Sequence, residues 1–493
     1  MAMRCGHRPV ILLLVVFVVV VSSPFSTALG VNWGGASSQP LPAPKVVTGL
    51  LRPNGVVRVK LADADPAALA SLVGSGIGVA VGIPNQMLRD LGASKKAAAS
   101  WVHDNVTRYL SDRGPGARLG IEYVAVGDEP FLLSYGKEFE PYVVGAATNI
   151  RLALTAAKAD RIKVIVPCSF DVIQTESNLP SKSHFRPDLN KTMTDLLSFL
   201  ANYSSPFVID VNPFSALQQN KNLSLDYLLF QKKSRPITDG NSSYNNFFDL
   251  SIDSLISSLS KVGFGEMEVV VGRIGWPTDG AVNATPSVAQ TFNKALIDHL
   301  KTKSGTPLRP KRFPTETYLF SLLDEDRRSI TAGNYERHWG IFTFDGQAKY
   351  NVDLGQGSKS LESAHNVEYL YPRWCVVNNN NDKDLSNVTA GASEACSNAD
   401  CTALSPGSSC FGIGWPANVS YAFNSYYQQR DQSQESCDFG GLGLITTVDP
   451  SLGDCRFAIA LRTSFSTSIH ETLIATRMMI LSAFVWLYLL SFS

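Results

Sequence analysis

Short apolar segments rich in β-branched residues recur along the chain between residues 29 and 344. These segments are apolar throughout rather than alternating, which is typical of strands buried on both faces of a sheet. Most of them are separated by stretches with helical character, including 97–110, 143–159 and 247–262. The predicted strands are 29–33, 56–61, 76–83, 121–126, 162–167, 206–211, 267–274, 317–323 and 339–344.

This repeated alternation of strand and helix predicts the fold class α/β, as a (β/α)₈ barrel. A doubly wound open sheet is the alternative that the same pattern allows. The glycine-rich segment Gly74–Gly78 resembles part of a dinucleotide-binding loop. Such a loop follows a strand and opens a helix, whereas this segment precedes a strand. We therefore interpret it as a turn.

The first 28 residues have the three parts of a secretory signal peptide. Arg4 and Arg8 precede an apolar run over 10–21, and small residues lead to Ala28. A charged start, an apolar centre and a small-residue end predict cleavage after Ala28. A membrane-spanning helix is the alternative, but the apolar run is short for a bilayer.

The opposite end carries a second targeting pattern. An apolar tail occupies 478–492, and a more polar spacer and small residues at 464–468 precede it. Small residues, a spacer and a terminal apolar tail are the parts of a glycosylphosphatidylinositol (GPI) anchor signal. We expect residues 461–493 to hold the attachment region and the removed tail, which places the protein on the outer face of the plasma membrane. A plain tail anchor is the alternative.

Cysteine is concentrated in the last part of the chain. Cys5 falls in the signal peptide, and Cys168 is alone in the large region. The remaining six are Cys375, Cys396, Cys401, Cys410, Cys437 and Cys455. In an exported chain, six closely spaced cysteines predict three disulfides in a small module, which we place at 365–460 after a large domain at 29–364. A zinc site is the alternative, but no paired C-x-x-C spacing supports it.

Charge and glycosylation motifs narrow the function classes. Lysine plus arginine and aspartate plus glutamate balance at 43 each, so nothing indicates a nucleic-acid partner. The seven histidines are scattered, and the spacing predicts no metal site and no cofactor. We expect a monomeric glycoprotein. Asn-x-Ser/Thr sequons occur at Asn105, Asn190, Asn202, Asn222, Asn241, Asn283, Asn387 and Asn418.

Polar residues gather where three of the predicted strands end. In a barrel, the carboxyl ends of the strands form the catalytic face. The residues at these ends are Asp128, Glu129, Arg273, Trp276, Asp324, Glu325, Asp326, Arg328 and Glu336. Carboxylates for acid–base chemistry beside a flat indole ring suit a carbohydrate substrate. Solvated loop charge is the alternative for any single acid of the set.

Five motifs of the large domain resemble plant endo-β-1,3-glucanases of glycoside hydrolase family 17, over about residues 30–360. The motifs occur in the same order as in that family and include Val-Gly-Asp-Glu-Pro ending at Pro130 and Gly-Trp-Pro ending at Pro277. The other three are 30–34, 63–66 and 76–85.

The cysteine-rich region resembles the X8 module, a β-1,3-glucan-binding domain of carbohydrate-binding module family 43. Its motifs include 374–376, 399–401, 421–427, 437–439 and 449–457. This resemblance implies a callose-like β-1,3-glucan as the partner. Tyr421, Tyr426 and Tyr427 could stack on sugar or belong to the module's core.

Resemblance to family 17 implies retaining hydrolysis by an acid and a nucleophile about 5–5.5 Å apart. Glu129 matches the acid, while Glu325, Arg328 and Glu336 match positions that shape the sugar site. Two positions depart from the family pattern. Arg273 stands where the family has its nucleophilic glutamate, and Asp128 stands where it has an asparagine.

An arginine at the nucleophile position changes the expected chemistry. A guanidinium has no lone pair with which to attack an anomeric carbon. Its charge should also favour the ionised form of Glu129, which could then not protonate a leaving group. Because the two departures carry opposite charge on facing strands, we expect Asp128 to pair with Arg273 within about 6 Å.

Three functions are compatible with this sequence: a β-1,3-glucan hydrolase, an inactive glucan-binding protein, and a structural wall protein whose carbohydrate affinity lies in the module alone. Family resemblance favours the first, and Arg273 favours the second. Hydrolysis with inversion would require Glu325 or Glu336 to activate water at about 6.5–9.5 Å from the acid.

Overall fold

The computed structural model describes residues 29–110, 118–302, 304–312, 314, 316–380 and 384–462. The predicted signal peptide and most of the predicted anchor region lie outside these residues. Within the part of the chain that the structure describes, no helix combines the length and apolar character needed to cross a bilayer.

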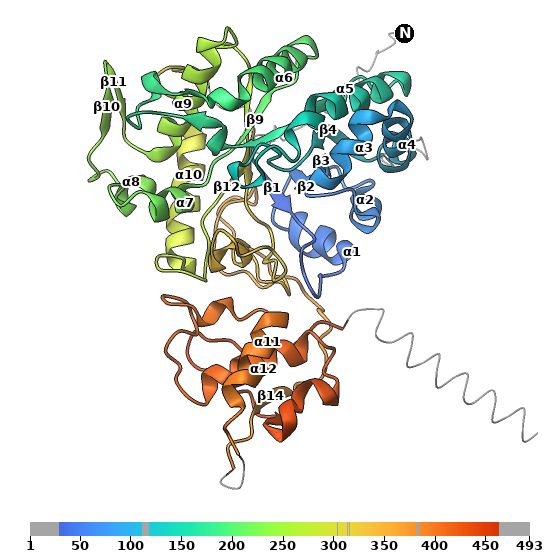
Figure 1. Cartoon of the computed structure of the whole chain (residues 1–493), viewed down its shortest axis with the longest axis vertical. Helices are drawn as coiled ribbons and strands as arrows, with labels where there is room; N and C mark the ends of the chain where they lie inside the picture. Colours follow the sequence, from blue (N-terminus) through green and yellow to red (C-terminus); the bar gives the residue numbers. More distant parts are fainter. Residues whose placement is uncertain are drawn as a thin grey trace, which may run out of the picture.

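The large domain is built on parallel strands that close into a barrel (Figure 1). Its nine hydrogen-bonded strands follow the order β5-β4-β3-β2-β1-β13-β12-β9-β6. The terminal pair, β5 and β6, are separated by Val166 alone, so they form one interrupted strand that closes the circle. The open doubly wound sheet is thereby excluded. The strands are β1 (Leu29–Trp33), β2 (Arg58–Leu61), β3 (Gly78–Ile83), β4 (Gly120–Val126), β5 (Lys163–Ile165), β6 (Pro167–Ser169), β9 (Phe207–Asp210), β12 (Val269–Ile274) and β13 (Glu316–Leu319).

Helices surround this barrel and begin at residues suited to helix starts. The side chains of Asp65, Ser94 and Asn246 each accept a hydrogen bond from a first-turn amide, so they cap α2, α4 and α9. The helices of the large domain are α1 (Ala43–Lys45), α2 (Pro66–Leu72), α3 (Leu88–Ala93), α4 (Lys95–Asn105), α5 (Glu140–Ala156), α6 (Asn190–Asn202), α7 (Pro213–Gln219), α8 (Leu225–Leu228), α9 (Phe247–Lys261) and α10 (Pro286–Thr302).

Apolar patterning located all the barrel strands and misassigned one segment. Residues 339–344 were expected to be a strand, but they are extended chain whose only pairings are isolated bridges such as Leu323 with Phe342. Trp339, Ile341 and Phe342 are nonetheless buried in the core of the large domain. Gly74 and Gly76 adopt positive φ angles of 69° and 76° immediately before β3, which confirms the predicted turn.

The cysteine-rich region forms a small separate module, coloured orange to red in Figure 1. It contains α11 (Val388–Asn398), α12 (Ala417–Gln428) and an antiparallel pair, β14 (Trp374–Val377) with β15 (Gly443–Thr446). Three disulfides join its six cysteines, as predicted, and no metal-binding cluster exists among the described residues. The pairs are Cys375–Cys437, Cys396–Cys401 and Cys410–Cys455.

Cys168 stays unpaired and buried in the barrel. The eight sequon asparagines all occupy exposed or half-buried positions, so each lies within reach of the surface.

Candidate active site at the carboxyl ends of the strands

A tight turn after β4 presents the two acids Asp128 and Glu129. Gly127 has a φ of 81° and Glu129 a φ of 50°, which is unusual for a residue with a side chain. Asn85 fixes this turn because its side-chain amide donates to the Asp128 carbonyl at 2.8 Å and accepts from the Asp128 amide at 2.8 Å. The clamp accounts for an asparagine at the end of the 76–85 motif.

Arg273, at the end of β12, lies among carboxylates. Its Nη2 atom is 2.5 Å from Asp128 Oδ1, and its Nη1 atom is 3.4 Å from Glu129 Oε2. The pairing of Arg273 with Asp128, inferred from two departures of opposite charge, is confirmed. The guanidinium therefore occupies the place that the resemblance assigns to the nucleophile, directly beside the candidate acid.

A third carboxylate completes this group. Asp210 ends β9, and its Oδ2 atom is 3.7 Å from Arg273 Nε. Within the described part of the chain, neither Asp210 oxygen has a hydrogen-bond partner, so the charges of Lys60 and Arg273 are what offset its burial. Sequence reasoning missed Asp210, although a charged residue ending a fully apolar strand is the signal that located the other acids.

Lys60 adds a second cation beneath the cluster. Its side chain is buried, and its Nζ atom donates to Asn32 Oδ1 at 3.2 Å. Asn32 in turn donates to the carbonyls of Gly272 and Leu319, so it ties β1 to β12 and β13. Burial and the neighbouring charge of Arg273 lower the pKa of Lys60. Sequence reasoning did not single out either residue.

Charge and burial shift the pKa values of the two acids in the β4 turn in opposite directions. Although burial opposes it, the charges of Arg273 and Lys60 lower the pKa of Asp128 to about 2. For Glu129, burial together with the nearby Asp210 and Asp128 outweighs Arg273 and raises the pKa to about 8. The expectation that Arg273 would hold Glu129 ionised is therefore wrong. Burial is the largest cause of the raised pKa, and the charge of Arg273 only partly offsets it.

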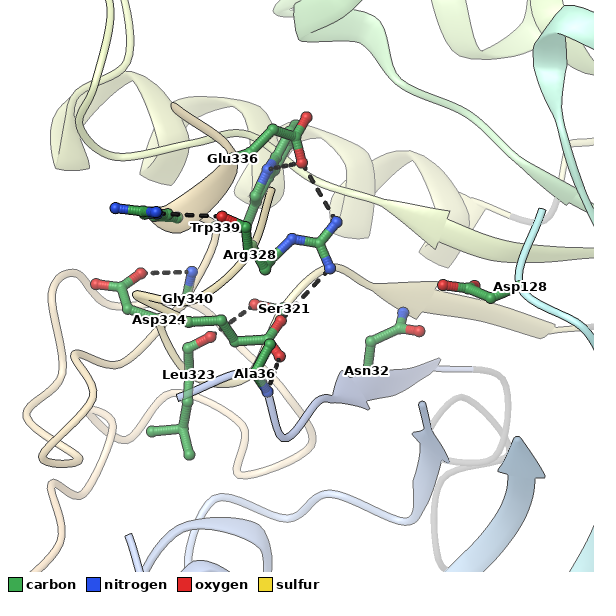
Figure 2. A network of polar contacts seen from close by, with 12 residues as sticks. Asn32, Ala36, Asp128, Ser321, Leu323, Asp324, Arg328, Glu336, Trp339 and Gly340 are labelled. Carbon is green, nitrogen blue, oxygen red and sulfur yellow. Dashed lines mark hydrogen bonds and ion pairs between the residues drawn. The ribbon is translucent and has the colours of Figure 1, made fainter. Parts of the chain in front are cut away.

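A second arginine organises the other side of the face. Arg328 Nη1 is 3.6 Å from Glu325 Oε2, and Arg328 Nη2 is 3.3 Å from Glu336 Oε2. In Figure 2, Arg328 extends toward Glu336, while Asn32 and Asp128 lie across from it. The three residues that the resemblance assigned to sugar-site shaping are thus brought together. Both carboxylates pair with this arginine.

An aromatic ring lies between the two arginines. The guanidinium carbon of Arg273 is 5.1 Å from the centre of the Phe320 ring, and that of Arg328 is 4.7 Å from it. Both distances fall within the range of cation–π attraction. Phe320 directly follows β13 and was not identified from the sequence.

Trp276 does not have the role that its position suggested. Its side chain is fully buried, its Nε1 atom donates to the Asn283 carbonyl at 2.9 Å, and its ring packs against Phe214 and Phe292. A ring enclosed in this way cannot stack on a sugar, so the substrate-binding assignment is corrected to a core role.

The module's tyrosines differ from one another. Tyr427 is fully buried and belongs to the core. Tyr421 packs against Phe457 and lines a cavity that faces the barrel, rather than an open surface. Tyr426 is half-buried, with Arg430 placed 4.9 Å above its ring. Tyr421 and Tyr426 are both half-buried, but only Tyr421 lines the cavity that faces the barrel.

The described geometry defines a class of protein: a (β/α)₈ barrel with an acidic site on its catalytic face, joined to a cystine-rich module. Residues 29–354 match the family model described as glycosyl hydrolases family 17, and residues 373–444 match the X8 domain. The chain belongs to glycosyl hydrolases family 17.

Similar proteins agree with this assignment. Glucan endo-1,3-beta-glucosidase 9 of Arabidopsis thaliana is 58% identical over 442 residues, which is 90% of each chain. Glucan endo-1,3-beta-glucosidase 5 of the same plant is 42% identical over 450 residues, 91% of each chain. Among solved structures, CJP38, a β-1,3-glucanase and allergen of Cryptomeria japonica pollen, is 32% identical with a TM-score of 0.62. It covers 66% of this chain, and this chain covers 99% of it.

Proposed function

We propose that this protein recognises β-1,3-glucan of the callose type through the carboxyl-end face of its barrel and through its X8 module. Membership of glycosyl hydrolases family 17 supports the substrate class, as do the names of the relatives and the module's match. The retained second cluster of Glu325, Arg328 and Glu336 supports a sugar-binding face.

The protein binds this glucan without cleaving it through a covalent intermediate. One observation carries this conclusion: Arg273 stands at the end of β12 in close pairing with Asp128. Retaining hydrolysis needs a carboxylate that attacks the anomeric carbon from the face opposite the acid. A guanidinium cannot supply that electron pair. Glu129 can still donate a proton, but Arg273 stands where the family has the attacking glutamate.

Hydrolysis is the second candidate function. It is favoured by the relative named glucan endo-1,3-beta-glucosidase 9 at 58% identity and by the raised pKa of Glu129, which suits a general acid. In that case a carboxylate other than Glu129 takes part in the reaction. After Asp128 and Glu129, the carboxylate nearest to Arg273 is that of Asp210.

The proposed location is the outer face of the plasma membrane, held by a GPI anchor. The terminal segments behind this proposal lie outside the described residues. Three disulfides in the module are compatible with an oxidising, exported environment. Release of the protein from intact cells by a phosphatidylinositol-specific phospholipase tests the anchor, and retention at the membrane contradicts it.

The test of the chemistry is reducing-sugar release from a soluble β-1,3-glucan. Arg273→Glu alone adds a carboxylate to Asp128, Glu129 and Asp210, so we expect an unstable and weakly active variant. Asp128→Asn combined with Arg273→Glu restores both family positions at once. We expect no release by the native protein and measurable release by this double variant.

Two controls make the result specific. The triple variant that adds Glu129→Gln must lose the new activity, because it removes the acid. Clear sugar release by the native protein would overturn the function of binding without cleavage. If that release is lost in Glu129→Gln but unchanged in Asp210→Asn, Glu129 is the acid and Asp210 takes no part in the hydrolysis.

A further inference from the structure

The C-terminal module contacts the same barrel loops that carry the candidate site. Figure 1 shows the module below the barrel, beside the segment that follows β13. The contacted loops follow β12 and β13, and they also bear Glu325, Arg328 and Glu336. Contacts with these loops come from the module's segments 400–409 and 428–429.

Arg337 joins the second cluster directly to the module. Its backbone carbonyl accepts from the Glu325 amide at 3.2 Å, and its Nε atom donates to the Arg328 carbonyl at 3.1 Å. Its Nη1 atom then donates to Asp400 Oδ1 of the module at 3.1 Å. This pair is largely shielded from water, since the two side chains are 18% and 16% exposed. Arg337 therefore contacts Glu325 through its backbone, and its side chain joins the Arg328 backbone to a module carboxylate.

The Asp400 carboxylate is itself held in place. It accepts from the amide and the hydroxyl of Thr402 at 3.0 and 2.6 Å. The same Thr402 hydroxyl is 2.6 Å from His338 Nε2, in the residue that follows Arg337. The module thus forms hydrogen bonds with two consecutive residues, Arg337 and His338, which directly follow Glu336.

Contacts on either side extend this attachment to the neighbouring loops. Ser409 donates to Asp279 through its amide at 2.9 Å and through its hydroxyl at 2.5 Å, in the loop that follows Arg273 and Trp276. Gln429 Nε2 donates at 2.8 Å to Asp326, the residue after Glu325. Both attachments are made to side-chain carboxylates of loops that follow β12 and β13.

Holding such loops matters for a binding site. Each loop residue left free to move gains roughly 1–2 kcal/mol of backbone entropy, which a ligand must offset when it binds. A preorganised sugar site needs its side chains held within about 0.5 Å. Segment 325–338 contains one short 3₁₀ turn and little other regular structure of its own, so its order depends on contacts made from outside.

We propose that the module is a structural part of the barrel's sugar site, with Arg337 and Asp400 as positioning residues for Glu325, Arg328 and Glu336. The module's role then extends beyond any affinity of its own for glucan. Its docking sets the geometry of one side of the groove.

Hydrogen–deuterium exchange of the full chain tests this proposal without any ligand. Asp400→Asn keeps an acceptor for Thr402 but removes the charge that pairs with Arg337. We expect exchange over 325–338 to accelerate about tenfold, with the module's helix α12 unchanged. Asp454→Asn, at an exposed module aspartate, is the matched control and should leave 325–338 as in the native protein.

A second variant resolves the effect by position. Ser409→Ala removes the hydroxyl contact to Asp279, so exchange should rise over 278–283 and not over 325–338. Unchanged exchange over 325–338 in Asp400→Asn, with α12 intact, would overturn the proposal.

Affinity for a soluble β-1,3-gluco-oligosaccharide provides the functional arm, and only this arm rests on the proposed function. We expect Asp400→Asn to bind about fivefold more weakly, with a melting temperature like that of Asp454→Asn. If the native protein binds no glucan while exchange responds as expected, the proposed function fails and the positioning role stands. If glucan binds equally to both variants and exchange is unchanged, the positioning role fails and the proposed function stands.

Discussion

Two arginine-centred clusters lie on one face of the barrel and differ in what else supports their carboxylates. Arg328 pairs with Glu325 and Glu336, but each of these acids also accepts from a neutral donor. Glu325 accepts from the Ala36 amide at 2.9 Å, and Glu336 accepts from Trp339 Nε1 at 3.3 Å. Arg273 instead faces three carboxylates, Asp128, Glu129 and Asp210.

The carboxylates of Asp128 and Asp210 depend on the cations Arg273 and Lys60. Asp210 is 3% exposed, and neither of its oxygens has a hydrogen-bond partner among the described residues. A buried charge without a compensating partner is far more costly than one that keeps a neutral donor. The comparison teaches that the acids beside Arg328 keep neutral donors of their own, whereas Asp128 and Asp210 depend on the charges of Arg273 and Lys60.

Replacing Arg273 with an apolar residue should therefore have the largest effect. We expect Arg273→Met to lower the free energy of unfolding by about 3–5 kcal/mol, because Asp128 loses its close ion pair and Asp210 loses one of its two neighbouring cations. Denaturant unfolding followed by fluorescence measures this difference. A loss below about 1 kcal/mol, within the range of a surface ion pair, would contradict the dependence on Arg273.

The second-largest effect that we expect is a dependence of the free energy of unfolding on pH, caused by Glu129. Its folded-state pKa of about 8 lies above the ordinary value of 4.5, so the native protein keeps a proton that the unfolded chain has lost. Between these values the native state binds more protons, and stability falls as pH rises. We expect the native protein to lose about 3–4 kcal/mol more than Glu129→Gln between pH 5 and pH 8.

Unfolding measured at several pH values checks this expectation. Parallel curves for the native protein and Glu129→Gln would show that Glu129 titrates near its ordinary value. Asp128 acts in the opposite direction at lower pH. Its pKa of about 2 means that its stabilising charge is present above about pH 4 and is lost as the pH falls toward 2.

The smallest effect on stability belongs to the second cluster. Arg328→Met leaves Glu325 and Glu336 with their neutral donors, so we expect a loss of about 1 kcal/mol. The same variant should weaken glucan binding clearly, because the two acids lose the group that orients them. A stability loss equal to that of Arg273→Met would remove the distinction between the clusters.

Much of this protein follows from local patterns in its sequence. Continuous apolar segments located the barrel strands, because a strand buried on both faces must be apolar along its whole length. Six clustered cysteines predicted a three-disulfide module. Acids that directly follow such strands located Glu129, Glu325 and the turn that bears Asp128, since parallel strands end on the same face.

Pairing of Asp128 with Arg273 could also be inferred in advance. Both residues depart from the family pattern, carry opposite charges and lie on facing strands. They therefore form an ion pair if the strands bring them close together. The sequence was misleading at Trp276, because a tryptophan beside acids looks the same whether its ring faces a groove or the core. Its neighbours Phe214 and Phe292 come from other elements and decide the outcome.

Other features depended on the tertiary structure alone. The protonation of Glu129 depends on burial and on Asp210, which is 81 residues away along the chain, and no local pattern gives the balance of those terms. The attachment of Asp400 to Arg337 joins two domains whose sequences can each be interpreted separately. By itself the sequence determined which chemical groups this protein has and on which face they stand. Only the fold decided which charges meet, because electrostatic and packing energies depend on distance in space rather than on separation along the chain.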